Sequence, residues 1–278
     1  SLLRRRTEEA GSAHGEDSPL NRPTTALRVL VTGAGSGIGL GIAGYLAGRG
    51  CAVCLTDLDA AAAARGATDL RARGFVATSL GLDVTSQQGI DAAIAALEPD
   101  GPDLLVNNAG LQHVAPLEEF PRERWEMLIA VMLTGSAMLT RAALPGMRRR
   151  RFGRIVNVGS IHSLVASPFK SAYVAAKHGL IGFAKTVALE TADTDITINT
   201  ICPSYVLTPL VEAQIAAQAR AHGIPEQRVV DEVMLRPMPK HAFVTIEELG
   251  GVVEFLASDV ARNITGQWIA VDGGWTSQ

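Results

Sequence analysis

From residue 27 onward, short apolar runs alternate with longer stretches in which apolar positions recur at helical spacing. The short runs are apolar without interruption, which is typical of strands covered by helices on both faces. The pattern predicts strands over Leu27–Thr32, Ala52–Thr56, Val76–Leu82, Leu104–Asn107, Arg154–Val158, Thr197–Ile201 and Trp268–Val271. Helices are expected to begin near Gly37, Asp59, Ser86, Pro121, Ser171, Pro209 and Thr245. This alternation predicts a single α/β domain over 27–278, with a parallel seven-stranded sheet.

Residues 1–26 show neither the helical nor the strand spacing of apolar residues, and we predict a flexible N-terminal tail there.

The chain carries 25 Lys and Arg against 28 Asp and Glu, a net charge of −3, so no nucleic acid partner is expected. No apolar run approaches the 18 residues that a membrane-spanning helix needs, so no membrane partner is expected either. Three cysteines are too few for a disulfide framework, which favours a reducing, cytoplasmic location.

A glycine-rich turn follows the first predicted strand, with the sequence Thr32-Gly33-Ala34-Gly35-Ser36-Gly37-Ile38-Gly39. Glycines at 33, 37 and 39 allow a tight turn, close approach of the backbone to a pyrophosphate, and close packing of the next helix on the strand. The first turn of that helix offers unpaired N–H groups to phosphates. A strand before the turn and a helix after it are the context of a dinucleotide site, so the domain is predicted to be a doubly wound Rossmann fold.

Asp57 ends the second predicted strand, where a carboxylate can accept hydrogen bonds from the adenosine ribose hydroxyls. A carboxylate repels a 2′-phosphate, and neither Ser36 nor Leu58 supplies a cation to neutralise one. The expected cofactor is therefore NAD rather than NADP. Capping of the following helix is the structural alternative for this aspartate. Cys51 and Cys54 have CxxC spacing, but they point to opposite faces of a strand and no second pair exists, so no metal site is predicted.

Ser160, Tyr173 and Lys177 form the most informative group. Ser160 closes a predicted strand at its carboxyl end, where open α/β sheets bind their ligands. Tyr173 and Lys177 are four residues apart and share one face of a predicted helix. We expect the ammonium to favour the phenolate of Tyr173, whose ordinary pKa is about 10, so that the tyrosine exchanges a proton near neutral pH. Ser160 would hold the substrate oxygen while a hydride passes to or from a nicotinamide.

In order and in spacing these motifs resemble the short-chain dehydrogenase/reductase family over about residues 27–278. The match also includes Asp83-Val84, Asn107-Asn108-Ala109-Gly110 and Pro203-x-x-Val206-x-Thr208. The resemblance implies catalytic roles for Ser160, Tyr173 and Lys177, and assembly as a homotetramer. It implies a cofactor site formed by Gly33, Ser36, Gly37, Ile38, Gly39, Asp57, Asp83, Val84, Asn108, Ala109, Gly110, Tyr173, Lys177, Val206 and Thr208.

Further stretches, 165–173 and 271–275 among them, are similar to the members of this family that interconvert D-3-hydroxybutyrate and acetoacetate with NAD. That likeness implies a pocket for a small 3-hydroxy acid, formed by Gln112, Ser160, His162, Lys170, Tyr173, Tyr205, Gln214 and Trp275. A four-carbon anion has little apolar area to bury, so its binding needs charge-assisted hydrogen bonds, and Lys170 supplies the charge. The alternatives are a solvated lysine at 170, a structural histidine at 162, an exposed helix residue at 214, and tail packing or a subunit contact at Trp275.

Two positions depart from the family pattern. Met132 stands where an asparagine usually positions a water in the proton relay from the lysine, and a thioether cannot take over that task. Ser204 stands where a glycine usually precedes the aromatic residue, which restricts the loop if a positive φ is required there. We expect activity to survive both changes.

Two other functions are compatible with a Rossmann fold. A reductase of 3-oxoacyl thioesters would prefer NADPH and would need room for a pantetheine arm, and Asp57 and Lys170 argue against it. A regulator that binds NAD without turnover would not need Ser160, Tyr173 and Lys177 together. Replacing Tyr173 with phenylalanine separates a catalyst from a regulator.

Overall fold

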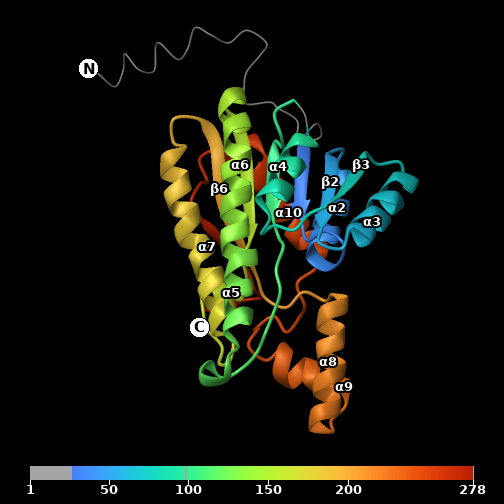
Figure 1. Ribbon diagram of the computed structural model, residues 1–278. Coiled ribbons are helices and arrows are strands. Elements are labelled where there is room, and N and C mark those ends of the chain that lie inside the picture. The colour runs from blue at the N-terminus through green and yellow to red at the C-terminus, as the bar shows by residue number, and fades with distance from the viewer. Residues whose placement is uncertain (1–26, 98, 278) are drawn as a thin grey trace.

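Seven strands alternate with helices in the computed structural model, which describes residues 27–97 and 99–277 (Figure 1). The strands are β1 (Arg28–Thr32), β2 (Ala52–Asp57), β3 (Ala77–Gly81), β4 (Leu104–Asn107), β5 (Phe152–Val158), β6 (Asp195–Pro203) and β7 (Trp268–Val271). The helices are α2 (Gly37–Gly48), α3 (Ala60–Ala72), α4 (Gln87–Ala95), α5 (Arg122–Ile129), α6 (Gly135–Arg150), α7 (Ser171–Glu190), α8 (Pro209–His222), α9 (Glu226–Val229) and α10 (Ile246–Ala257). The predicted tail over 1–26 lies outside the described residues.

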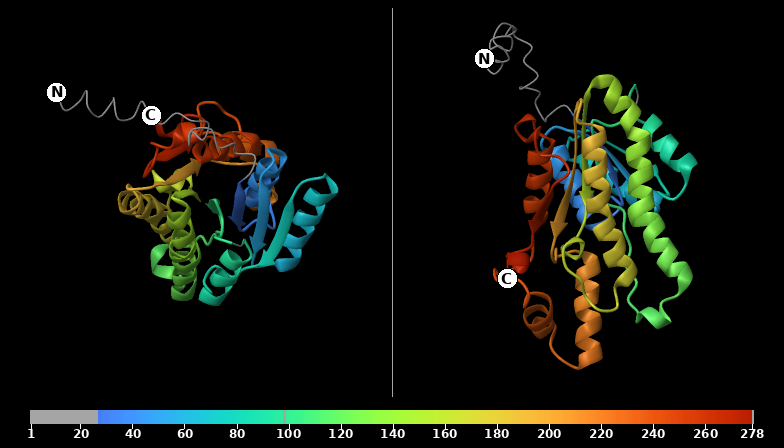
Figure 2. Two further views of the ribbon diagram at one scale, coloured as in Figure 1. Left: turned by 90° about the horizontal axis from the view of Figure 1, so that it is seen from above. Right: turned by 90° about the vertical axis from the view of Figure 1, so that its left-hand side faces the viewer.

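All seven strands run parallel in one sheet, in the order β3-β2-β1-β4-β5-β6-β7. The chain returns from β3 at one edge to β4 in the middle, so the strand order reverses between β1 and β4. Helices α2, α3 and α10 cover one face, and α4, α6 and α7 cover the other (Figure 2). The predicted doubly wound Rossmann fold is confirmed, and such a sheet binds its ligand at the carboxyl ends of the strands beside the reversal.

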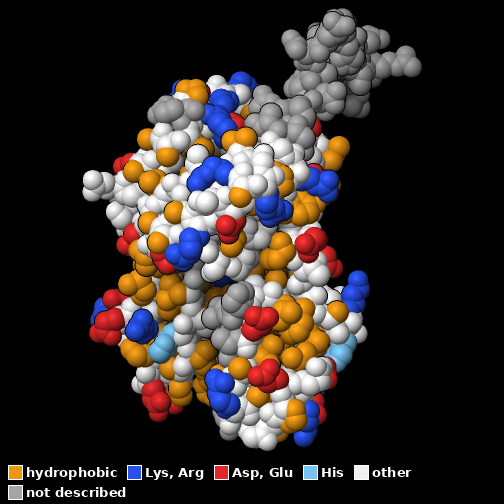
Figure 3. Space-filling view, turned by 90° about the vertical axis from the view of Figure 1, so that its right-hand side faces the viewer, with side chains coloured by type: hydrophobic (Ala, Val, Ile, Leu, Met, Phe, Trp, Pro, Cys, Tyr) orange, Lys and Arg blue, Asp and Glu red, His pale blue; other side chains and the backbone are white. Residues whose placement is uncertain are grey.

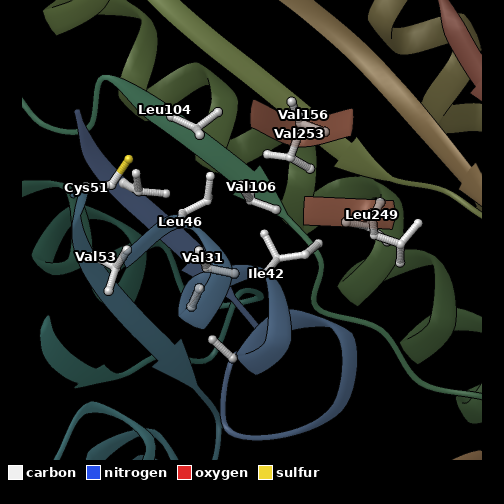
Figure 4. Packing of buried hydrophobic residues seen from close by; sticks show 14 of the residues in the cluster. Val31, Ile42, Leu46, Cys51, Val53, Leu104, Val106, Val156, Leu249 and Val253 are labelled. Atoms are coloured by element: carbon white, nitrogen blue, oxygen red, sulfur yellow. The ribbon is translucent and has the colours of Figure 1, made fainter. Parts of the chain in front are cut away.

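Each face of the sheet carries its own cluster of buried apolar side chains. Val31 of β1 and Val106 of β4 face Ile42 of α2 and Val253 of α10 in the first cluster (Figure 4). Leu30, between Val29 and Val31 in sequence, belongs to the second cluster, on the opposite face. This alternation explains why the strand runs are apolar at every position, since both faces of each central strand are buried.

The predicted boundaries agree with the observed ones to within two residues. Helices α3, α4 and α10 begin one residue later than expected, because Asp59, Ser86 and Thr245 cap them with their side chains and do not occupy the first helical position. The pattern did not predict the short α9, nor the π-helical turns Ala130–Thr134 and Val230–Met234. The first of these turns joins α5 to α6, so the helix expected from Pro121 continues without a break to Arg150.

The helical segment Arg122–Arg150 corrects one expectation, because among the described residues it is long and apolar enough to cross a membrane. The sequence pattern by itself predicts no segment of that kind. In the fold, Leu139, Ala143 and Met147 of this segment are buried in the cluster that covers one face of the sheet. Packing in the core therefore accounts for part of its apolar composition, since 39% of its most apolar 18-residue window is buried.

Candidate active site

A cavity of about 590 Å³ lies at the carboxyl ends of the strands and takes residues from the ends of β2 and β5 and from the loops after β1, β4 and β6. Twenty of the residues predicted for cofactor or substrate line it: Gly33, Ser36, Gly37, Ile38, Asp57, Asp83, Val84, Asn108, Ala109, Gly110, Gln112, Ser160, His162, Lys170, Tyr173, Lys177, Tyr205, Val206, Thr208 and Gln214. Gly39 and Trp275 are predicted site residues that do not line it. The fold thus brings most of the predicted site together.

The glycine-rich turn has the backbone that its sequence predicts. Gly33 and Gly37 have φ angles of 61° and 55°, in the left-handed region that glycine adopts without strain. A Cβ atom at Gly33 would lie 2.8 Å from the Cα atom of Ala109, so the turn also requires a glycine for close packing. The Nδ2 group of Asn108 holds the turn by donating to the carbonyls of Thr32 at 2.9 Å and Gly33 at 3.0 Å.

Helix α2 begins directly after this turn, and no side chain caps its first N–H groups. Ser36, Gly37 and Ile38 at this helix end line the cavity, so the N–H groups are available to a phosphate there. Gly39 does not line the cavity. A Cβ atom at this position would collide with the carbonyl oxygen of Gly33, so a glycine is needed here for the packing of α2 on the turn.

Asp57 links the second strand to the glycine-rich turn. One carboxylate oxygen accepts from the backbone N–H of Gly35 at 2.8 Å, and the other accepts from the N–H of Asp59 at 3.0 Å. The helix-capping alternative is wrong for this residue, because Asp59 caps α3 by accepting from Ala61 and Ala62. Asp57 therefore braces the turn and presents its carboxylate to the cavity.

Ser160, Tyr173 and Lys177 come together as predicted. Ser160 lies just after β5, and its hydroxyl forms a hydrogen bond with the hydroxyl of Tyr173. The Ser160 oxygen also accepts from the backbone N–H of His162 at 3.1 Å, which fixes the serine rotamer. One turn further along α7, the Nζ atom of Lys177 stands 5.7 Å from the centroid of the Tyr173 ring.

Lys177 is almost completely buried beside the end of β5. Its Nζ atom donates to the carbonyl oxygen of Val158 at 2.6 Å. The β4–β5 ladder ends at the pair Asn107–Asn157, one residue before Val158. The carbonyl oxygen of Val158 therefore has no backbone partner in β4, and Lys177 takes that place. Burial lowers the pKa of Lys177 to about 8, because an ammonium loses its hydration there.

The pKa of Tyr173 departs from the sequence-based expectation. Burial raises the pKa of this phenol, and the hydrogen bond with Ser160 opposes the rise. The expectation that Lys177 lowers this pKa is therefore wrong for the chain by itself, since loss of hydration outweighs the other effects. Near neutral pH, Tyr173 carries its proton.

Lys170 and His162 form a second polar pair in the cavity. The Nζ atom of Lys170 lies 3.4 Å from the Nε2 atom of His162. An ammonium only donates, so Nε2 must accept, and the ring proton is on Nδ1. Burial and the charge of Lys170 lower the pKa of His162 to about 4, so the ring is neutral near pH 7. The pair offers one positive charge and one neutral N–H group to a ligand.

Trp275 does not line the cavity, but its ring lies beside two residues that do. Its ring centroid stands 6.1 Å from that of Tyr205 and 6.3 Å from that of His162, and both of these residues line the cavity. The 3-10 helix that follows β7 holds the Trp275 ring against these neighbours. That Trp275 closes the pocket over a substrate stays a prediction.

Gln214 reaches the cavity from α8, which projects with α9 away from the sheet (Figure 1). In Figure 3 hydrophobic side chains gather on the lower part of the molecule, in the region of these two helices, with acidic and basic side chains around them. Their own small core includes Ile215 of α8 and Val229 of α9. Gln214 is therefore carried by an element with a separate core.

Met132 and Ser204, the two departures from the family pattern, both fit their surroundings. Met132 lies in the π-helical turn, buried in a cluster with Leu128 and Tyr173. Ser204 does not have a positive φ, so a side chain is tolerated without backbone strain. Its N–H group donates to the carbonyl of Val271 at 3.0 Å, in continuation of the β6–β7 ladder.

Sequence reasoning missed nine residues of the cavity wall. They are Leu58, Leu82, Leu111, Val131, Val158, Gly159, Ile161, Ser204 and Val211. Most are apolar neighbours of predicted residues, and an apolar side chain beside a motif carries no signature of its own. Among these nine, Ser204 alone carries a signal in the sequence, because it stands where the family pattern has a glycine.

Comparison with known proteins places this geometry in a family. The profile described as short chain dehydrogenase matches residues 27–219. A D-beta-hydroxybutyrate dehydrogenase of Cupriavidus necator is 47% identical over 251 residues, which cover 90% of this chain and 97% of that protein. A protein of the same name from Rhizobium meliloti is 48% identical, over 90% of this chain and 98% of that protein.

A solved structure supports the same assignment. The actinorhodin polyketide ketoreductase with NADPH has a TM-score of 0.85 and 32% identity, over 92% of this chain and 99% of that one. The profile spans more than half of this chain, and the two relatives are matched over nearly their whole length. This chain therefore belongs to the short-chain dehydrogenase family, whose Rossmann fold binds a nicotinamide dinucleotide.

Proposed function

We propose that this protein is an NAD-dependent dehydrogenase that interconverts D-3-hydroxybutyrate and acetoacetate. The observation that carries the proposal is that the Lys170 ammonium and the hydrogen-bonded hydroxyls of Ser160 and Tyr173 line one cavity. A short hydroxy acid has a carboxylate and a reacting hydroxyl, and these two groups match the two sets of side chains. The names of the relatives from C. necator and R. meliloti point to the same substrate.

The cavity fits a nicotinamide dinucleotide. Gly33 and Gly37 leave room for a close approach of phosphates, and the uncapped start of α2 supplies N–H donors for them. Asp57 would accept from the adenosine ribose hydroxyls and repel a 2′-phosphate, which supports NAD over NADP. Asp83, Val84, Asn108, Ala109, Gly110, Val206 and Thr208 complete the proposed cofactor site. When bound, the cofactor accepts a hydride or returns it.

The protein residues would hold the substrate and move its proton. Lys170, His162, Gln112 and Gln214 would bind the carboxylate, and Ser160 would hold the reacting oxygen. In oxidation the Tyr173 phenol would first release its own proton to solvent, since burial keeps it protonated in the chain by itself. The phenolate would then take the hydroxyl proton of the substrate as the C3–H bond breaks and its electron pair leaves with the hydrogen as hydride. In reduction the Tyr173 phenol gives that proton back to the new alcohol oxygen.

The test is turnover by the purified chain, followed by absorbance of the reduced cofactor. D-3-hydroxybutyrate with NAD should give the highest kcat/KM, ahead of the L enantiomer and of NADP. Tyr173→Phe should remove nearly all turnover while the dissociation constant for NADH stays within about twofold, because the phenol ring keeps its place. An intact enzyme that binds NADH and oxidises no 3-hydroxy acid would refute the proposal.

A reductase of 3-oxoacyl thioesters is the second candidate. It is favoured by the likeness to the actinorhodin polyketide ketoreductase with NADPH. Acetoacetyl-coenzyme A with NADPH, assayed beside acetoacetate with NADH, separates the two functions directly. The homotetramer and the cytoplasmic location stay predictions, and light scattering on the purified chain tests the first.

A further inference from the structure

Three polar atoms of the cavity-lining residues are buried without a hydrogen-bond partner among the described residues. They are Oε1 of Gln112, Nδ1 of His162 and Oγ of Ser204. Buried polar groups in folded proteins nearly always have partners, so a group of exceptions beside one cavity indicates that a ligand supplies them. Gln112 and His162 already belong to the proposed substrate site. Ser204 has had no role in it.

The position of Ser204 is on the substrate side of the cavity. It follows β6, which lies beyond β5 in the sheet, whereas the glycine-rich turn and Asp57 follow β1 and β2 on the other side of β4. Its sequence neighbour Tyr205 and the 3-10 helix that carries His162 are parts of the same wall. The Ser204 hydroxyl is thus separated by two strands from the residues proposed to hold the adenosine and the phosphates.

The backbone on both sides of this hydroxyl is fixed. The N–H group of Ser204 donates to the carbonyl of Val271 at 3.0 Å, and the carbonyl of Tyr205 accepts from the N–H group of Val244 at 2.9 Å. These bonds fix the Cβ atom of Ser204, so its hydroxyl can move only by rotation about χ1, and it has no partner among the described residues. A polar group held in this way is ready for an incoming ligand, since no existing hydrogen bond must be broken.

We propose that the Ser204 hydroxyl donates a hydrogen bond to an oxygen of the bound hydroxy acid, which makes Ser204 a specificity-determining residue. The inference rests on the proposed function. A hydroxyl is the right group, because it can donate to either a carboxylate or an alcohol oxygen. With a glycine at this position the donor is absent, so the serine adds a contact that the family pattern lacks.

The proposal has a double consequence for Ser204→Ala. The variant keeps the Cβ atom and the backbone but removes the hydroxyl. In the free enzyme it removes an unpaired buried group, so the midpoint of thermal unfolding should rise or stay the same. In the complex it removes a hydrogen bond, so KM for D-3-hydroxybutyrate should rise about 5- to 10-fold. The dissociation constant for NADH, measured by fluorescence, should not change.

Thr200→Val is the matched control. The Thr200 hydroxyl is also buried without a partner among the described residues, but Thr200 lies within β6 and does not line the cavity. This variant should keep the wild-type KM. If Ser204→Ala does not fold, Ser204→Gly tests the same point with the residue that is usual in the family.

The outcomes separate the two proposals. If the wild-type enzyme does not turn over a 3-hydroxy acid, the proposed function fails first. If it does, and the Ser204 variant has a KM within twofold of wild type, the role of Ser204 is refuted. A change in the NADH dissociation constant with an unchanged KM also refutes it, because the hydroxyl would then face the cofactor. A raised KM with unchanged NADH binding supports it.

Discussion

Replacing Lys177 with methionine should remove one contribution by which stability rises with pH, and it should abolish turnover. Burial lowers the pKa of this lysine from 10.5 to about 8. At about 1.4 kcal/mol per pKa unit, holding the ammonium in the fold costs about 3 kcal/mol near pH 7. The hydrogen bond to Val158 is part of that balance, because methionine leaves the buried carbonyl without its donor. The absolute stability of Lys177→Met at pH 7 should thus change less than the full amount.

The sign of the pH effect follows from proton binding. Between about pH 8 and 10.5 the unfolded chain holds the lysine proton and the folded chain has released it. Stability rises with pH wherever the unfolded state binds more protons, so Lys177 makes the wild type more stable as pH increases. From pH 7 to pH 9.5 this contribution amounts to about 2 kcal/mol. Lys177→Met lacks it.

The assay is urea unfolding of the two proteins at equal concentration, at pH 7 and at pH 9.5. The difference between wild type and variant is the informative quantity, because the buried thiols of Cys51 and Cys202, whose pKa values are raised to about 11, titrate in both. Lys240→Met, at an exposed position, is the control and should follow the wild type. Equal pH dependence in Lys177→Met and wild type would show that the buried amine does not carry this cost.

Three further predictions concern other parts of the site. Lys170→Met should raise KM for D-3-hydroxybutyrate about 10- to 100-fold, because a charge-assisted hydrogen bond to the carboxylate is lost. It should leave kcat/KM for 2-butanol, which has no carboxylate, unchanged. An equal fall in kcat/KM for both alcohols would contradict a carboxylate site. Asp57→Asn should reduce the preference for NAD over NADP at least about tenfold, measured as the ratio of kcat/KM values, and an unchanged ratio would remove Asp57 from cofactor selection. Gly39→Ala should lower the free energy of unfolding by about 1–3 kcal/mol in urea, since its Cβ atom collides with the Gly33 carbonyl, and a neutral effect would show that α2 moves aside.

The fold and most of the site could be predicted because their signals are local. Strand runs, helix caps and the glycine-rich turn depend on residues within a few positions of each other. The pair Tyr173 and Lys177 needs only one helical turn, and Ser160 is placed by the end of a strand. A parallel sheet then brings the ends of separate strands to one edge, so motifs far apart in sequence meet there without further information.

The errors concern quantities that depend on packing between distant segments. The pKa of Tyr173 was expected to fall because Lys177 is near in sequence, but burial decides its direction and burial is not a local property. The position of Trp275 beside the cavity depends on how the end of the chain meets Tyr205 and His162, which no local pattern specifies. The tautomer of His162, which no sequence pattern addresses, follows from a single contact with Lys170 across a loop.

The ionisable groups of the cavity share one physical feature, which links stability to ligand binding. Burial favours the neutral form of Lys177, of His162 and of Tyr173 alike, and it also lowers the pKa of Lys170. A buried group that has lost its hydration gains when a ligand brings an opposite charge or a hydrogen-bond partner. A carboxylate beside Lys170 would meet a cation, and the N–H group of His162 is on Nδ1, the ring nitrogen that does not face Lys170 and has no partner among the described residues. The same desolvation that weakens the protein by itself therefore strengthens its interaction with a small hydroxy acid, for which buried apolar area contributes little.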